Sequence, residues 1–169
     1  MFTVEYGTDN LNNLNKQINN GITTVGDDIL ARIIIVENGG IEAQDLENLI
    51  QSMGHEVVAI ESRSSDAVKR TQKLMPDLVL MDIILKGIGD GVDAAQEIKK
   101  LDIPVIYLTA HSDEVTVKRA MKTEPYGYLL KPFNVMELKL AIELALYRKK
   151  VERMKETGTC DIQLDTTTK

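Results

Sequence analysis

The stretch ARIIIVEN, residues 31–38, decides the fold. Its consecutive, mostly β-branched apolar residues lack the polar alternation of a strand with one wet face. They are typical of a strand buried on both faces in a parallel sheet. Four more short apolar runs follow: EVVAI from Glu56, DLVLM from Asp77, PVIYLT from Pro104 and GYLL from Gly127. Because the chain between neighbouring runs is long enough for a helix, the sequence predicts five strands alternating with helices.

The segments between these runs repeat apolar residues at helical spacing, so each predicted helix has one face to bury. Examples are Leu46, Leu49, Ile50 and Met53 in the first segment and Val117, Ala120 and Met121 in the fourth. Residues that end or cap helices stand at the matching places, and they are Gly54, Asp90-Gly91, Ser112-Asp113 and Asn134. A regular β-α repeat predicts right-handed crossovers and an α/β fold with a doubly wound parallel sheet.

Composition and net charge limit the class of protein that this chain can be. The chain has 169 residues, 43% of them hydrophobic and 27% charged, which predicts one domain with its own core. A net charge of -6 argues against a nucleic-acid surface, which needs clustered Lys and Arg. The single cysteine, Cys160, cannot form an internal disulfide, and no apolar run approaches the roughly 20 residues that cross a bilayer. We therefore expect a cytoplasmic protein that contacts neither nucleic acid nor membrane.

Three segments follow from the pattern along the chain. Residues 1–30 are rich in Asn, Gly and Thr and predict an N-terminal extension that is a weak helix or disordered. Residues 31–155 form the domain, including an extended last helix. Residues 156–169 are a polar C-terminal tail without periodicity.

Polar residues close four of the predicted strands. They are Glu37-Asn38 after the first, Asp82 after the third, Thr109 after the fourth and Lys131 after the fifth. Each alone is typical of a cap or a solvated side chain, but the carboxyl ends of parallel strands share one edge, where ligands bind. Acids beside a lysine and a hydroxyl suit Mg²⁺ and phosphate oxygens. The set predicts phosphoryl-transfer chemistry.

The segments IIIVEN, LVLMD, VIYLTA and GYLLKPF, and their spacing, resemble the response-regulator receiver domains of two-component signalling. The resemblance covers about residues 31–150, and it is closest in appearance to receivers of archaeal and bacterial hybrid sensor proteins. It implies a flavodoxin-like (βα)5 sandwich with five parallel strands in the order 2-1-3-4-5. It also implies a receiver that takes a phosphoryl group from a sensor histidine kinase in a Mg²⁺-dependent phosphorelay and signals to a downstream protein partner.

The resemblance assigns roles to the residues at the strand ends. Asp82 is the phosphoacceptor. Glu37, Asn38, Asp82 and the backbone carbonyl of Ile84 are the expected ligands of Mg²⁺. Lys131 supplies a second positive charge to the phosphoryl group. No external substrate is expected, since the sequence has no Ser-His-Asp order and no Gly-rich phosphate loop.

Four further residues complete the expected site. Thr109 hydrogen-bonds the phosphoryl oxygen, and Tyr128 turns inward in response, although its spacing equally suits an ordinary strand aromatic. Pro132 is expected to follow a cis peptide bond. His111 lies near the pocket mouth and is expected to modulate hydrolysis of the acyl phosphate, although a solvated residue at a helix entry has the same pattern.

Asn38 departs from the family pattern, which usually has an acid there. Because an amide brings no charge, we expect weaker Mg²⁺ binding and slower phosphorylation. The alternative function is a phosphorylation-independent pseudo-receiver that acts as an adaptor or dimerisation module. A flavodoxin-like cofactor protein is a third hypothesis, but the first β-α turn, ENGGIEAQ, lacks a hydroxyl-rich phosphate loop.

The last predicted helix carries two apolar lines. Val135, Leu138, Ile142 and Ala145 are expected in the core, whereas Leu140, Leu144, Tyr147, Val151 and Met154 form a second, heptad-like line. A second line needs a second partner. The sequence leaves open a homodimer or coupling helix on the one hand and intrachain packing against residues 9–20 on the other.

Overall fold

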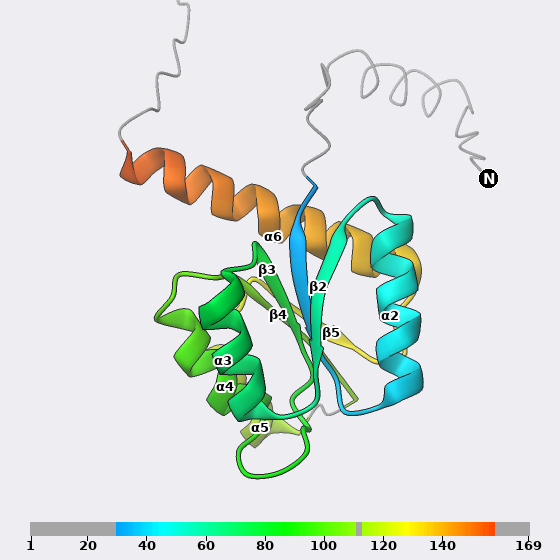
Figure 1. Ribbon diagram of the computed structural model, residues 1–169. Helices are drawn as coiled ribbons and strands as arrows, with labels where there is room; N and C mark the ends of the chain where they lie inside the picture. The colour runs from blue at the N-terminus through cyan, green and yellow to red at the C-terminus, as the bar shows by residue number, and fades with distance from the viewer. Residues whose placement is uncertain (1–29, 111–112, 158–169) are drawn as a thin grey trace, which may run out of the picture.

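The computed structural model describes residues 30–110 and 113–157 (Figure 1). They form a five-stranded parallel sheet in the order β2-β1-β3-β4-β5, which confirms the predicted fold class. The strands are β1 (Arg32–Val36), β2 (Glu56–Glu61), β3 (Leu78–Met81), β4 (Val105–Thr109) and β5 (Gly127–Leu130). The helices are α2 (Gly40–Ser52), α3 (Ser64–Leu74), α4 (Gly91–Lys99), α5 (Glu114–Met121) and α6 (Val135–Glu156).

The predicted N-terminal extension lies outside the described residues except for Leu30, and so does most of the predicted C-terminal tail. None of the described helices is long and apolar enough to span a lipid bilayer.

Helices cover both faces of the sheet (Figure 1). On one face, α2 and α6 pack against the side chains of Ile33 and Ile35, which project from β1. On the other face, α3, α4 and α5 pack against Ile34 and Val36 of the same strand. Because both faces of β1 are buried, its four apolar residues must follow one another, as the sequence pattern predicted.

Tyr107, in the middle of β4, is fully buried among α3, α4 and α5. Its hydroxyl shares a hydrogen bond of 2.9 Å with Oγ1 of Thr123, which also donates to the carbonyl of Ala120 at the end of α5. Burial raises the pKa of Tyr107 to about 12, so the hydroxyl stays protonated. The polar group of a large core residue is thus satisfied inside the protein.

Helix α6 runs beyond the sheet (Figure 1). Leu138, Ile142 and Ala145 are buried as predicted, but Val135 is 52% exposed, so its expected place in the core was wrong. Val135 is the first residue of the helix, one turn before Leu138, its first buried residue. Asn134 caps this end: its side chain accepts from the amide of Glu137, and the side chain of Glu137 accepts in return from the amide of Asn134.

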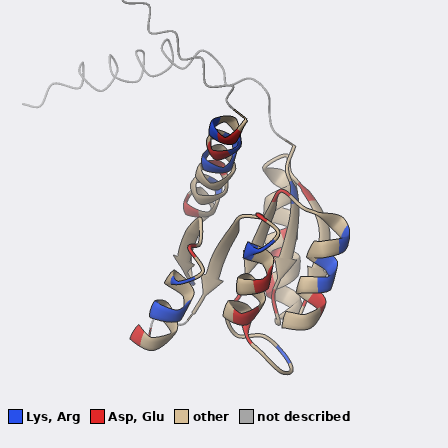
Figure 2. Cartoon of the chain, turned by 90° about the vertical axis from the view of Figure 1, so that its left-hand side faces the viewer, with Lys and Arg blue, Asp and Glu red and all other residues tan. Residues whose placement is uncertain are grey.

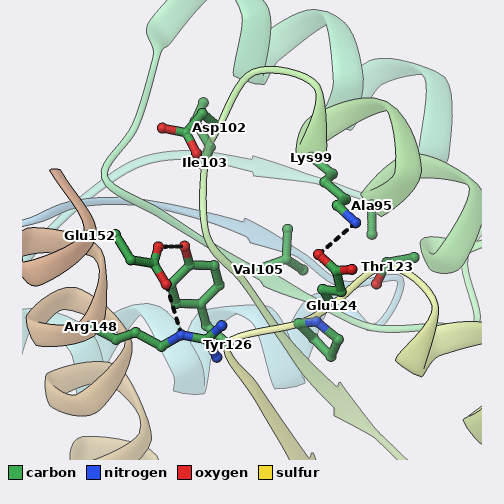
Figure 3. A pocket seen from close by; sticks show the side chains of 11 residues that line it. Ala95, Lys99, Asp102, Ile103, Val105, Thr123, Glu124, Tyr126, Arg148 and Glu152 are labelled. Carbon is green, nitrogen blue, oxygen red and sulfur yellow. Dashed lines mark hydrogen bonds and ion pairs between the residues drawn. The ribbon is translucent and has the colours of Figure 1, made fainter. Parts of the chain in front are cut away.

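The far part of α6 is attached to the domain by polar contacts (Figure 3). The hydroxyl of Tyr126 donates to Glu152, and the guanidinium of Arg148 lies 4.5 Å from the centre of the Tyr126 ring. These residues line a cavity of about 250 Å³ between α6, the start of β5 and the end of α4. Lys149, which is buried, pairs with Asp102. These contacts fix the helix to the domain well past the sheet.

Gly91, the first residue of α4, allows that helix to begin directly against the end of β3. A Cβ at this position would lie 2.0 Å from the backbone oxygen of Asp82. Asp90 caps the helix, since its side chain accepts from the amides of Val92 and Asp93. The absence of a side chain at residue 91 therefore brings the α4 terminus close to Asp82.

We expect Gly91→Ala to lower the free energy of unfolding by about 1–3 kcal/mol, because the added methyl must push the Asp82 carbonyl aside. Chemical denaturation monitored by circular dichroism measures this. Gly40→Ala is the matched control, since a Cβ there meets nothing within 4 Å and an alanine suits the helix. Equal stability of the two variants would contradict the packing argument.

Candidate functional site

The site lies at the carboxyl edge of the sheet, where β1, β3 and β5 end. Val36 of β1 pairs with Met81 of β3, so the next residues, Glu37 and Asp82, follow neighbouring strands side by side. The amide of Asp82 donates to the carbonyl of Val36 at 2.8 Å, which continues the ladder to this point. The sheet thereby brings two acids together that are far apart in the sequence.

Lys131 joins these two acids. Its Nζ lies 2.5 Å from Oε2 of Glu37 and 3.0 Å from Oδ2 of Asp82. The side chains of Glu37, Asp82 and Lys131 are only 4%, 11% and 23% exposed. Burial alone would lower the pKa of Lys131, but its hydrogen bonds to both carboxylates outweigh burial and raise that pKa. The lysine therefore remains a cation between two acids.

Backbone amides orient both carboxylates. Oε1 of Glu37 accepts from the amide of Gly39 at 2.9 Å, and Oδ1 of Asp82 accepts from the amide of Ile84 at 3.0 Å. In each case the donor is two residues further along the chain, in the loop that leaves the strand. Each acid thus has one oxygen held by its own loop and one oxygen facing Lys131.

Asn38 links the two loops. Its Nδ2 donates to the backbone carbonyl of Ile84 at 2.6 Å. The family resemblance implies that the Asn38 side chain and the Ile84 carbonyl are both metal ligands. In the structure, a hydrogen bond from the Asn38 amide nitrogen joins the two groups. The neutral Asn38 side chain therefore hydrogen-bonds the carbonyl oxygen of Ile84, which is one of the expected ligands of Mg²⁺.

Glu37, Asp82 and the Ile84 carbonyl are the oxygen donors that the site offers to Mg²⁺. Among the described residues, no three His, Cys, Asp or Glu side chains gather as a metal-binding group. Two carboxylates and a carbonyl nevertheless suit Mg²⁺, which takes one or two carboxylates and keeps several waters. Glu37, Asp82 and the Ile84 carbonyl fit that requirement, provided that the Asn38 amide releases the carbonyl.

The other predicted site residues differ in how closely they approach the two acids. Thr109 is fully buried at the end of β4, next to β3, and its backbone carbonyl accepts from the amide of Lys131 at 2.9 Å. The peptide bond between Lys131 and Pro132 is cis, the geometry that the family resemblance implies. His111 lies outside the described residues.

Tyr128 lies away from the acids, on β5. Its side chain is half-buried and packs against the layer of α3, α4 and α5. Its ring centre is 5.9 Å from that of Tyr107, with the planes tilted by 58°. Burial, together with the negative charge of Asp113, raises the pKa of Tyr128. This is the packing of a strand aromatic, with one neighbour on the loop before α5.

An ion pair near the site is one that the sequence did not predict. Arg119 of α5 donates to Oδ2 of Asp90 at 2.8 Å and to Oδ1 of Asp93 at 3.2 Å. Burial alone would raise the pKa of Asp90, but the hydrogen bond and charge of Arg119, with the amides of Asp93 and Val92, lower it. The pair connects α5 to the first turn of α4, which begins against Asp82. No local pattern marks a contact between residues so far apart.

A doubly wound sheet that carries two acids, bridged by a lysine, at its carboxyl edge defines the class of protein. The family model of the response regulator receiver domain matches residues 33–143. The chain therefore belongs to the response regulator receiver domain family.

Curated relatives agree with this assignment. The transcriptional regulatory protein PdtaR of Mycobacterium tuberculosis is 37% identical over 118 residues, which are 69% of this chain and 57% of PdtaR. The phyllosphere-induced regulator PhyR of Methylorubrum extorquens is 30% identical over 131 residues, which are 76% of this chain and 48% of PhyR. The chain thus spans about half the length of these relatives.

A solved structure gives the same result. The signal receiver domain of a modulated diguanylate cyclase from Desulfovibrio desulfuricans superposes with a TM-score of 0.70 at 35% identity, covering 73% of this chain and 98% of that domain.

We expect Lys131→Met to lower the free energy of unfolding at pH 7 by roughly 1–3 kcal/mol, because it leaves two buried carboxylates without their hydrogen-bonded cation. In the unchanged protein, the raised pKa of Lys131 means that its contribution is fully present below the ordinary lysine pKa of 10.5 and is lost as the pH rises through the higher pKa of the folded state. Urea unfolding at several pH values, with a chelator present, measures both effects.

The matched control is Lys86→Met, which removes an exposed lysine from the loop after β3. Its stability should stay within about 0.5 kcal/mol of the unchanged protein at every pH. A loss for Lys131→Met that does not depend on pH would contradict the electrostatic explanation.

Proposed function

We propose that this chain is a phosphoacceptor receiver that takes a phosphoryl group on Asp82 from a sensor histidine kinase. The observation that carries the proposal is the contact of one lysine cation, Lys131, with both Asp82 and Glu37. A phosphoryl group attached to Asp82 brings anionic oxygens to this cation, which is already within hydrogen-bond distance of the attacking carboxylate.

The transfer is a single displacement at phosphorus. A carboxylate oxygen of Asp82 attacks, and a new O–P bond forms while the P–N bond to the kinase histidine breaks. The imidazole nitrogen keeps the electron pair of the broken bond. Glu37, Asp82 and the Ile84 carbonyl would hold Mg²⁺, which would supply positive charge to the phosphoryl oxygens when bound. Lys131 contributes charge from the β5 side, and the Ile84 amide keeps the Asp82 carboxylate oriented.

The signal leaves through a protein surface in this proposal. An acyl phosphate on Asp82 carries about two negative charges where the carboxylate carries one, and it places them beside the ends of β3, β4 and β5. Thr109 then hydrogen-bonds a phosphoryl oxygen, and Tyr128 moves into the space behind it. The downstream partner reads the altered surface of α5, β5 and α6. The exchange takes place in the cytoplasm and involves no external substrate.

Acetyl phosphate and Mg²⁺ should add the mass of one phosphoryl group to the protein, and Asp82→Asn should abolish that gain because an amide cannot form the acyl phosphate. Intact-protein mass spectrometry measures both. Asp93→Asn is the matched control, an exposed acid in the first turn of α4 whose loss should leave the mass gain intact. A gain that survives Asp82→Asn would refute the proposed acceptor.

A second candidate function is a phosphorylation-independent adaptor. The observation in its favour is the hydrogen bond from Asn38 to the Ile84 carbonyl, which competes with Mg²⁺ for that oxygen. In this alternative the hydrogen bond keeps the two loops joined without a cation, and the fold serves as a binding surface.

Asn38→Asp distinguishes the two functions. An aspartate cannot donate to the Ile84 carbonyl and adds a negative charge, so we expect at least severalfold tighter Mg²⁺ binding and faster phosphorylation. Isothermal titration with MgCl₂ and the rate of mass gain measure these. The control is Asn48→Asp, the same change on the exposed face of α2. Unchanged magnesium affinity in Asn38→Asp, with no mass gain in either protein, would favour the adaptor.

A further inference from the structure

Helix α6 presents an apolar line to solvent, directly opposite the face that it buries. We call it the outer line, and its members are Leu140, Leu144, Tyr147, Val151 and Met154. Leu140, Leu144 and Tyr147 are 53%, 57% and 60% exposed, Met154 is 43% exposed, and Val151 is half-buried. Steps of four and three residues alternate along the line, which is the heptad spacing of helices that pair.

The outer line is held in a fixed position. The contacts of Tyr126 with Glu152 and Arg148 attach α6 to the domain along the stretch that carries the line (Figure 3). The pair of Lys149 with Asp102 adds a further attachment there. Side chains of both charges lie along this helix (Figure 2). The line is therefore a preformed surface rather than one that needs ordering upon binding.

We propose that the outer line pairs with the outer line of a second copy of this chain, with the two helices antiparallel. The line is self-complementary about a point between Ala145 and Leu146. In that register Leu144 faces the partner's Tyr147, and Leu140 faces the partner's Val151. Every member except Met154 then has an apolar residue opposite.

Charge selects this arrangement. Residues that flank a heptad line set the orientation of paired helices. In the antiparallel register, Glu143 lies beside the partner's Lys150, and symmetry repeats this attraction. Glu143 is now 3.7 Å from Lys139 of its own helix, in an exposed pair that contributes little and is easily exchanged.

The alternatives place like charges together. In a parallel pair, Glu143 lies beside the partner's Arg148, but Lys150 lies beside the partner's Lys155, and this repulsion occurs twice. An antiparallel pair shifted by one heptad brings Lys150 against the partner's Lys150. The register centred between residues 145 and 146 has the attraction without these repulsions.

Sedimentation velocity of the full chain over a range of concentrations tests the pairing. The outer line covers about two heptads, so we expect a reversible dimer that forms in the micromolar range or above. Leu144→Asp should weaken dimerisation at least tenfold, because it puts a charge at the centre of the seam. The matched control Val135→Asp places the same group on an exposed apolar residue outside the line, and it should dimerise like the unchanged protein.

Charge reversal tests the orientation. Lys150→Glu should weaken an antiparallel dimer, whereas it should strengthen a parallel one by removing the repulsion from the partner's Lys155. Adding Glu143→Lys to Lys150→Glu should restore the antiparallel dimer. Thermal unfolding of each variant verifies that the domain itself remains folded, as expected for exposed positions.

Three results would overturn the proposal. The first is a monomer up to the highest soluble concentration, including a monomer that Leu14→Asp converts to a dimer, which would assign the line to residues 9–20. The second is a dimer that Leu144→Asp leaves unchanged. The third is a dimer that Lys150→Glu strengthens. Asp82→Asn should dimerise normally without any phosphodonor, so failure here is separate from failure of the proposed phosphorylation.

Discussion

The site depends on one electrostatic constraint: two carboxylates that the sheet forces together need a cation between them. Parallel strands β1 and β3 end side by side, so Glu37 and Asp82 cannot separate without breaking the ladder. Lys131, the residue after β5, supplies that cation. Burial of all three groups strengthens the attraction between the lysine and the two carboxylates. The contact of Lys131 with Glu37 and Asp82 therefore stabilises the fold and also forms the centre of the proposed phosphoryl-transfer site.

The surroundings of Asp82 are held from several directions. The Ile84 amide orients its carboxylate, the α4 terminus approaches its carbonyl at Gly91, and Arg119 connects that terminus to α5. A change of charge on Asp82 therefore meets a connected set of polar groups. The set leads from the carboxyl edge of the sheet to the helix that, with β5 and α6, forms the proposed output surface.

Much of this could be predicted from the sequence because it follows from local patterns. Apolar runs gave the strands, and polar residues after them gave Glu37, Asp82 and Lys131 as a group. The amide contact of Asn38 with Ile84 and the pair of Arg119 with Asp90 could not be predicted, since each depends on how two distant loops or helices are placed. Val135 was misjudged because helical spacing alone does not say where along its length a helix begins to meet the sheet.

The tethering of α6 gives the domain a stiff arm. The contacts of Tyr126 and Asp102 with α6 fix the rotation of this helix about its own axis relative to the domain. Each residue of an α-helix turns the chain by about 100° and advances it by about 1.5 Å. A domain joined to α6 by a continuous helix would have a fixed orientation relative to this domain. Inserting a single residue at the junction would rotate that domain by about 100° about the helix axis.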